Sequence, residues 1–420
     1  MIVNLLVDDG KHPEALLALE HGMVFRGRSC GAEGEMFGEI VFNTSMTGYQ
    51  EIVTDPSYAG QIVALTYPQI GNYGITKIDM QADRPNLRGL VVHDMCYEPS
   101  NWQSVESLPD FLKRNNVVAI EDVDVRALTL NIREKGAMRA AISTKDLDPE
   151  HLIERVQASP HIAEHNFVAD VSHEDRFTVK PEGRKVRHQI VVVDCGIKQG
   201  ILDWLAKVGC EVTVVPWNTP FSAIDELYPD GVFFSNGPGD PSSVPETVET
   251  VKATLGKYPI FGICLGNQML SMAAGAEIEK LKYGHHGANE PVMNLLTGKV
   301  EITAQNHNYG PVFSSFGPLI PELSGGVKEH PTDLRYWSQH HIAPVAQTKK
   351  FGRVRLTHVN LNDGSCEGIQ FLDIPAFSMQ YHPEGKPGPN DSTYAFEAFV
   401  RLMDGNKDYL DIDVREGRNH

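Results

Sequence analysis

The chain has 420 residues, 41% of them hydrophobic, so it is long enough for two or three domains that each bury a core. Asp and Glu number 55 against 37 for Lys and Arg, which gives a formal net charge of −18. This charge disfavours a nucleic-acid partner, because binding to a phosphate backbone depends on a surplus of Lys and Arg.

The N-terminal residues indicate where the protein resides, and the cysteines indicate whether it holds a metal or disulfides. Asp8 and Asp9 stand where a secretory signal would carry positive charge, and no apolar run approaches the length of a membrane span. We therefore expect a cytoplasmic protein with no membrane partner. The six cysteines are scattered without a C-x-x-C spacing, so the sequence predicts no metal site and no disulfide framework.

Residues 1–171 mix extended and helical patterns. Extended segments punctuated by glycine include 39–43 and 61–67, and helical stretches lie near 108–115 and 124–134. This mixture predicts an α+β or α/β domain.

Residues 172–187 are polar and charged, with little apolar periodicity, which predicts a linker between two domains. From residue 188 to 420 the chain alternates short apolar runs with helical segments. The runs are rich in Val, Ile and Phe and bounded by Gly or Pro, as is typical of parallel strands buried on both faces. They are residues 189–194, 211–216, 231–235 and 259–263. The pattern predicts a doubly wound α/β domain, whose ligands bind beyond the carboxyl ends of the strands.

The run P-I-F-G-I-C-L-G-N-Q, residues 259–268, places Cys264 between a short strand and a helix that begins near Gly266. Such a sharp turn exposes a nucleophile at the sheet edge, and Gly262 and Gly266 supply the small residues that it needs. The following helix N-terminus favours a thiolate. The alternative is a buried structural cysteine, which is the commoner fate of a single Cys.

The run F-S-M-Q-Y-H-P-E-G ends a later strand-like stretch with His382 and Glu384. If strand geometry persists through Pro383, both side chains point to one side, so that Glu384 orients the ring and His382 serves as a base toward a thiol. A His-x-Glu pair alone is weak evidence, since most histidines are not catalytic. Together with Cys264, the pair indicates a Cys–His–Glu triad.

The third motif is S-N-G-P-G-D-P, residues 235–241, which follows a predicted strand. Its glycines allow backbone N–H groups to approach a ligand, so it predicts either an oxyanion hole or an ordinary Gly/Pro turn. Phosphate binding is disfavoured, because no G-x4-G-K-[ST] pattern is present.

These three motifs resemble the signatures of a class I, triad-type glutamine amidotransferase domain. Residues 42–74 then resemble the N-terminal domain of the carbamoyl-phosphate synthase small subunit, which other amidotransferases lack. The resemblance extends over nearly the whole chain and also includes residues 119–129, 133–137, 282–292 and 303–307.

The resemblance implies a mechanism. Cys264 would attack the carboxamide of glutamine to form a glutamyl thioester, while His382 would transfer protons and Glu384 would hold the imidazolium. The backbone N–H groups of Leu265 and Gly239 would hold the oxyanion. The other glutamine-binding residues that it implies are Ser45, Gly237, Gln268, Asn306, Asn308 and Tyr309.

The resemblance also implies a partner. A large synthetase subunit would receive ammonia through a protected route and would bind bicarbonate, ATP and Mg, while this chain would carry no cofactor of its own. The sequence does not indicate whether the product serves pyrimidine or arginine synthesis.

Some positions depart from the family pattern. Asn308 stands where the family usually has glycine, and asparagine tolerates positive φ better than other non-glycine residues. Tyr309 replaces a common Phe, and Asn267 a frequent His. The adjacent His285 and His286 suggest a metal site, but no other ligands stand at suitable spacing, so we expect a packed turn.

Residues 313–350 form a connection that is longer than usual for the family and rich in Pro and Gly, so we expect a surface excursion rather than core.

Two rival functions are less consistent with the sequence. An amidotransferase serving anthranilate or guanylate synthesis would lack residues 42–74. A regulatory subunit without catalysis would not need Cys264, His382 and Glu384.

Overall fold

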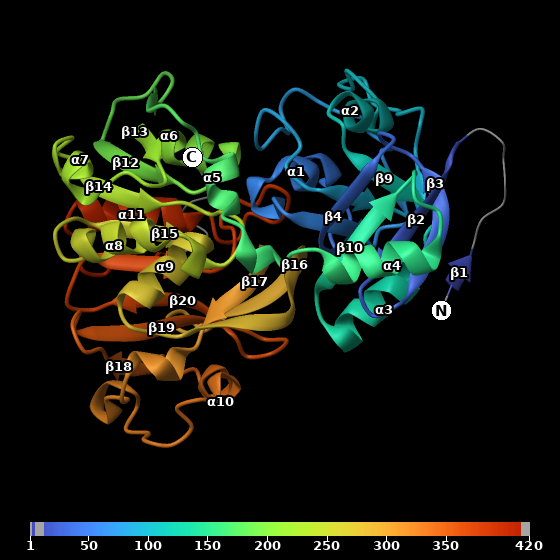
Figure 1. Cartoon of the computed structure of the whole chain (residues 1–420). Helices are drawn as coiled ribbons and strands as arrows, with labels where there is room; N and C mark the ends of the chain where they lie inside the picture. Colours follow the sequence, from blue (N-terminus) through green and yellow to red (C-terminus); the bar gives the residue numbers. More distant parts are fainter. Residues whose placement is uncertain (1, 5–11, 413–420) are drawn as a thin grey trace. The chain divides into compact units, whose positions relative to one another are not determined.

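The computed structural model describes residues 2–4 and 12–412, which divide into two compact units (Figure 1). Unit 1 is Met1–Phe167 with Lys282–Gly287, and unit 2 is Val168–Leu281 with Ala288–His420. Every helix in the described ranges is too short or too polar to cross a membrane.

Unit 1 includes a short piece of the later chain, residues 282–287. The sequence patterns place this piece in the C-terminal domain instead. The long strand β16 (Ile278–Asn294) contains this piece. Within unit 1, Ala137 N–H donates to the Lys282 carbonyl at 2.9 Å and Thr44 N–H to the His286 carbonyl at 3.1 Å. These backbone bonds join residues that are far apart in the sequence, so local sequence patterns do not reveal them. His286 therefore lies in a strand rather than in the expected turn.

Unit 1 is built on a mixed sheet. Its described strands follow the order β1-β3-β2-β10-β4-β5-β7-β9, and β3 also pairs with β9, which closes the sheet on itself. The strands are β1 (Ile2–Asn4), β2 (Glu14–Leu19), β3 (Val24–Ser29), β4 (Glu35–Asn43), β5 (Gln61–Leu65), β7 (Gly89–Val91), β9 (Val118–Glu121) and β10 (Met138–Ser143). A small separate ribbon pairs β6 (Gln69–Ile70) with β8 (Asp94–Met95).

The helices of unit 1 begin at capping residues that the sequence supplies. Ser107, Asp124 and Asp148 accept backbone N–H bonds at the starts of α2, α3 and α4. The helices are α1 (Tyr49–Thr54), α2 (Leu108–Arg114), α3 (Val125–Lys135), α4 (Pro149–Ala158) and α5 (Phe167–Val171), the last of which begins at the unit boundary. The helical stretches expected near 108–115 and 124–134 are thus present.

Unit 2 is the predicted doubly wound domain. Strands β13, β12, β14, β15 and β21 are parallel neighbours in that order, and β20, β19 and β16 extend the sheet in antiparallel fashion. The strands are β12 (His188–Asp194), β13 (Cys210–Pro216), β14 (Gly231–Phe234), β15 (Ile260–Ile263), β17 (Lys299–Pro311), β19 (Arg353–Asn360), β20 (Cys366–Phe371) and β21 (Ala376–Met379).

Helices cover both faces of the parallel strands. Residues of α8 (Pro245–Thr254) and α9 (Leu265–Ala273) belong to one buried apolar cluster, and residues of α6 (Gln199–Lys207) and α11 (Tyr394–Met403) belong to another. The strands need apolar side chains on both faces for this reason, which explains their nearly continuous Val, Ile and Phe runs. The short α7 (Phe221–Asp225) lies between β13 and β14 in the chain.

The segment expected to be a linker contains a strand. Residues 177–179 form β11 (Phe177–Val179), which pairs antiparallel with β13 so that Phe177 lies opposite Val214. Just before it, His173 Nδ1 lies 2.7 Å from Asp194 Oδ2. The apolar alternation of this stretch is too short to stand out among its charged neighbours, yet it suffices for an edge strand.

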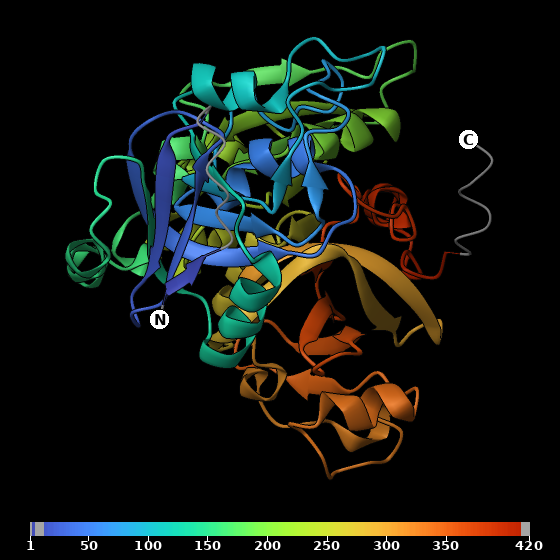
Figure 2. The same ribbon diagram turned by 90° about the vertical axis from the view of Figure 1, so that its right-hand side faces the viewer.

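Residues 313–350 are only in part the surface excursion that their Pro and Gly content suggests: residues 325–333 are almost all exposed, but the residues on either side of them are anchored in the core. Phe313, Phe316 and Trp337 are buried in the same cluster as α8 and α9, and the indole N–H of Trp337 donates to the His330 carbonyl at 2.7 Å. The segment carries α10 (Leu334–Gln339) and β18 (Val345–Gln347), and β18 pairs with β19 (Figure 1, Figure 2). Its turns separate anchor residues that are each inserted into the core.

This burial makes the segment necessary for stability. Trp337→Ala should lower the free energy of unfolding of unit 2 by about 3–5 kcal/mol, because it leaves a cavity where a fully buried ring lay. Leu323→Ala, in the same segment but 41% exposed, should change it by less than about 0.5 kcal/mol. Urea denaturation followed by circular dichroism measures both. Equal stability of the two variants would restore the surface interpretation.

Candidate active site

Cys264 occupies a strained turn between β15 and α9. Its backbone has φ 55° and ψ −104°, which L residues adopt rarely. Its N–H donates to the Met379 carbonyl at 2.8 Å, and its carbonyl accepts the Gln268 N–H at 3.1 Å. The side chain is buried, and the thiol lies 3.7 Å from the Asn306 carbonyl oxygen. The turn thus has the geometry of a nucleophile elbow.

The two glycines around Cys264 are required by space. A Cβ on Gly266 would lie 2.2 Å from the Phe234 carbonyl oxygen, and a Cβ on Gly262 would lie 2.9 Å from backbone atoms of Gly266. Neither approach is possible for a larger residue without moving backbone. The glycines therefore allow α9 to start directly above the strands, which the sequence analysis anticipated from their spacing.

His382 and Glu384 lie just beyond the end of β21. His382 Nδ1 lies 2.8 Å from Glu384 Oε1, and both side chains are buried. The backbone N–H of His382 donates to the Ala304 carbonyl at 2.8 Å, which ties this segment to β17. Because β21 is the parallel neighbour of β15, with Met379 opposite Ile263, the histidine segment and Cys264 follow the same sheet edge.

Lys198 is a member of the site that the sequence analysis missed. Its ammonium lies 2.7 Å from Glu384 Oε1, and its side chain is 2% exposed. It also donates to the Lys386 carbonyl. The residue follows β12 and precedes α6, so it too stands beyond the carboxyl end of a parallel strand. That position was the available signal, because such edges are where doubly wound domains bind ligands.

The buried charges set the protonation states. Burial alone would raise the pKa of Glu384, but Lys198 and His382 outweigh it and lower the pKa to about 2. Burial would lower the pKa of His382, but Glu384 outweighs it and, with a contribution from the nearby Cys264 thiol, raises the pKa to about 10. His382 Nε2 has no hydrogen-bond partner of normal geometry among the described residues. The raised pKa thus favours the imidazolium form of the ring at neutral pH.

The loop at residues 235–241 follows β14 at the same sheet edge. Gly239 has φ +84°, and a Cβ on Gly237 would lie 2.2 Å from the Cys195 carbonyl oxygen. Leu265 is the first residue of α9, so its N–H has no acceptor within the helix. Backbone donors of this kind are what an oxyanion hole requires.

Three of the expected glutamine-binding residues lie on β17. Asn306, Asn308 and Tyr309 are buried there, and Gln268 Nε2 on α9 donates to the Tyr309 carbonyl at 2.8 Å. Asn308 lies within the strand and is not among the residues with positive φ. The replacement of the family's glycine therefore does not strain the backbone.

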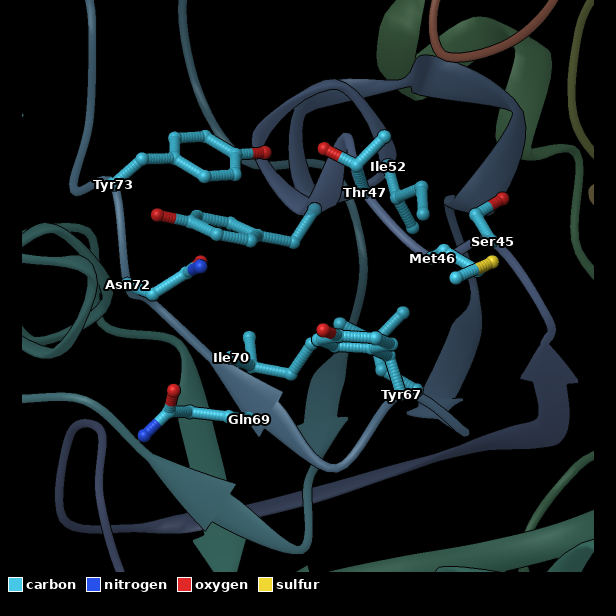
Figure 3. Close-up of a pocket in the computed structure, with 11 residues that line it drawn as sticks. Ser45, Met46, Thr47, Ile52, Tyr67, Gln69, Ile70, Asn72 and Tyr73 are labelled. Carbon is cyan, nitrogen blue, oxygen red and sulfur yellow. The ribbon is translucent and has the colours of Figure 1, made fainter.

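Ser45 belongs to unit 1 and lines a pocket there, beside Met46 and Tyr67 (Figure 3). The pocket encloses about 380 Å³, part of it open to solvent. Ser45 N–H donates to Asn43 Oδ1 at 2.8 Å, while its buried hydroxyl has no hydrogen-bond partner in the described part of the chain.

Family models divide the chain nearly as its fold does, although the second model also spans residues 282–287 of unit 1. Residues 191–315 and 320–402 match "Glutamine amidotransferase class-I", so unit 2 carries a class I glutamine amidotransferase domain. Residues 17–142 match "Carbamoyl-phosphate synthase small chain, CPSase domain". The chain belongs to the carbamoyl phosphate synthase small chain family and is an enzyme subunit.

Curated relatives agree over almost their full lengths. The carbamoyl phosphate synthase small chain of Thermotoga maritima is 48% identical over 93% of this chain and 98% of that protein. The small chain of Syntrophotalea carbinolica is 45% identical over 94% and 99%. The pyrimidine-specific small chain of Bacillus subtilis is 40% identical over 92% and 95%. These matches argue against an amidotransferase that serves anthranilate or guanylate synthesis.

The raised pKa of His382 predicts how stability depends on pH. A folded pKa above the unfolded value contributes stability below about pH 6.5, and this is lost as pH rises toward about 10. The difference in unfolding free energy between the native chain and His382→Asn should therefore shrink over this range. Urea titrations at about pH 6, 8 and 10 measure it. A difference that is constant with pH would contradict the charged ring.

Proposed function

We propose that this small chain hydrolyses glutamine with a Cys264–His382–Glu384 triad and delivers the ammonia to a large synthetase subunit. The observation that carries the proposal is the position of Cys264, held on a strained elbow next to a charged imidazole. A buried structural cysteine needs neither feature.

The first half of the proposed reaction forms a thioester. The Cys264 thiolate attacks the carboxamide carbon of glutamine, and the N–H groups of Leu265 and Gly239 hold the oxygen that becomes negative. The carbon–nitrogen bond then breaks as His382 donates its proton to the leaving nitrogen. Ammonia departs and the ring becomes neutral.

The second half returns the enzyme to its starting state. His382 takes a proton from a water molecule as the water attacks the thioester carbon, and the carbon–sulfur bond breaks. Glutamate and the thiolate result. Glu384 stabilises the imidazolium at both ends of this cycle, and Lys198 keeps Glu384 ionised, since the pKa of that carboxyl is lowered to about 2.

The remaining site residues would recognise glutamine rather than transform it. Side chains on β17 and α9 line the buried edge next to Cys264. We assign substrate binding to Ser45, Gly237, Gln268, Asn306, Asn308 and Tyr309.

The proposed chemistry needs no cofactor on this chain, because side chains, backbone N–H groups and water supply every proton and every nucleophile. ATP and Mg belong to the proposed partner, which would activate bicarbonate. Ammonia is then the only chemical intermediate that the two subunits share.

Substitutions in the triad should lower carbamoyl phosphate synthesis from glutamine but not synthesis from ammonium. Cys264→Ser replaces the thiol with a far less acidic hydroxyl, so glutamine-dependent carbamoyl phosphate synthesis by the complex should fall by at least about a thousandfold. His382→Asn should behave similarly, while Glu384→Gln should be milder because it removes charge stabilisation and keeps a hydrogen bond. Synthesis from added ammonium salt should continue in all three.

The ammonium assay is the control for assembly and folding. Full glutamine-dependent activity in Cys264→Ser would refute the proposed nucleophile. Loss of the ammonium-dependent activity as well would mean that Cys264 supports the structure of the complex instead.

A further inference from the structure

Glu301, on β17, is a buried acidic residue with no part in the proposed reaction. Its Oε1 accepts hydrogen bonds from Asn294 Nδ2 and the Tyr394 hydroxyl, both at 2.9 Å. Its Oε2 accepts from the Tyr381 hydroxyl at 3.2 Å and from Ser392 Oγ at 2.7 Å. Each oxygen thus has two donors, which is the arrangement that a buried carboxylate requires.

The donors around Glu301 are neutral groups with fixed proton positions. Tyr394 OH accepts from Asn294 Nδ2 at 3.0 Å and donates to Glu301, and it lies 3.1 Å from His358 Nε2. Burial lowers the pKa of His358, which keeps that ring neutral. The carboxylate therefore acts as a junction of hydrogen bonds rather than as half of an ion pair.

The Glu301 carboxylate bonds to residues at both ends of the catalytic segment. Tyr381 directly precedes His382, and Ser392 follows the irregular stretch 382–391 that also holds Glu384. Both residues bond to the same oxygen, Oε2 of Glu301. The strand that carries Glu301 also accepts the His382 N–H through the Ala304 carbonyl.

An irregular segment needs such fastening. Residues 380–393, between β21 and α11, form no helix or strand; their sheet-like bonds are the isolated bridge between His382 and Ala304 and the bond from Gln380 N–H to the Glu367 carbonyl. Joining the two ends of a loop removes much of its conformational freedom. Catalysis in turn depends on holding the base within a fraction of an ångström of its working position.

We propose that Glu301 is a positioning residue that fastens both ends of the segment 381–392 and thereby holds His382 in place beside Cys264. The inference rests on the proposed function. It assigns Tyr381 and Ser392 to the same task, one at each end of the segment.

Tyr381→Phe and Ser392→Ala test the proposal, because each releases one end of the segment and barely alters packing. Each should lower kcat for glutamine hydrolysis by about three- to tenfold, with little change in KM. The double variant should lose less than the product of the two single losses, because either release already frees the segment.

The rate of Cys264 alkylation by iodoacetamide, measured against pH, gives a readout that stability alone does not move. In the two variants the dependence of this rate on pH should differ from that of the native chain, because His382 is no longer held in place beside the thiol. Protection by glutamine identifies the signal of Cys264.

Tyr97→Phe is the matched control. It removes a tyrosine hydroxyl that donates to Glu121 at 2.6 Å in unit 1, so it breaks the same kind of bond away from the catalytic segment. We expect unchanged kcat and an unchanged alkylation profile. If Tyr381→Phe and Ser392→Ala also keep both and lose only thermal stability, the proposal is wrong. A native chain that fails to hydrolyse glutamine within an ammonium-active complex would instead refute the proposed function.

Discussion

The backbone of Cys264 is the constraint on which the site depends. A residue with φ 55° and ψ −104° persists only where its surroundings enforce it. Here Gly262 and Gly266 leave room for the turn, and the Met379 carbonyl takes the Cys264 N–H. That carbonyl belongs to β21, so the bond that holds the elbow also fixes the strand from which the histidine segment continues. The strand order of the sheet thus brings Cys264 and the histidine segment to the same edge.

The second constraint is electrical. Lys198, Glu384 and His382 form a line of alternating charges with almost no exposure to solvent. Buried ion pairs seldom add much stability, because desolvation offsets their attraction. Their value here is the control of proton positions. The lowered pKa of Glu384 keeps it ionised between Lys198 and His382, and the raised pKa of His382 keeps the proton on the ring.

Patterns that depend on local sequence were predictable. The elbow at Cys264 and the spacing of His382 and Glu384 carry their meaning within a few residues, and the parallel strands are recognisable from their apolar runs. The fold class and the family also follow from such local motifs.

Features that depend on tertiary contact were not predictable. Lys198 looks like any lysine after a strand until Glu384 is brought against it. The segment containing Trp337 reads as a loop because its anchors have no regular period. Strand β11 is too short to outweigh its charged neighbours. The return of residues 282–287 to unit 1 depends on backbone bonds and on the packing of Tyr283 against the unit 1 core. Sequence periodicity shows which face of a helix or strand is buried. It does not show which other element packs against that face.

The central claim is that Cys264 forms a covalent glutamyl intermediate, and hydroxylamine tests it most directly. Hydroxylamine competes with water for a thioester, so the native complex supplied with glutamine and hydroxylamine should release γ-glutamyl hydroxamate. The account predicts hydroxamate from the native chain and none from Cys264→Ser. Glutamate production without any hydroxamate over a wide range of hydroxylamine concentrations, or hydroxamate from Cys264→Ser at the native rate, would contradict it.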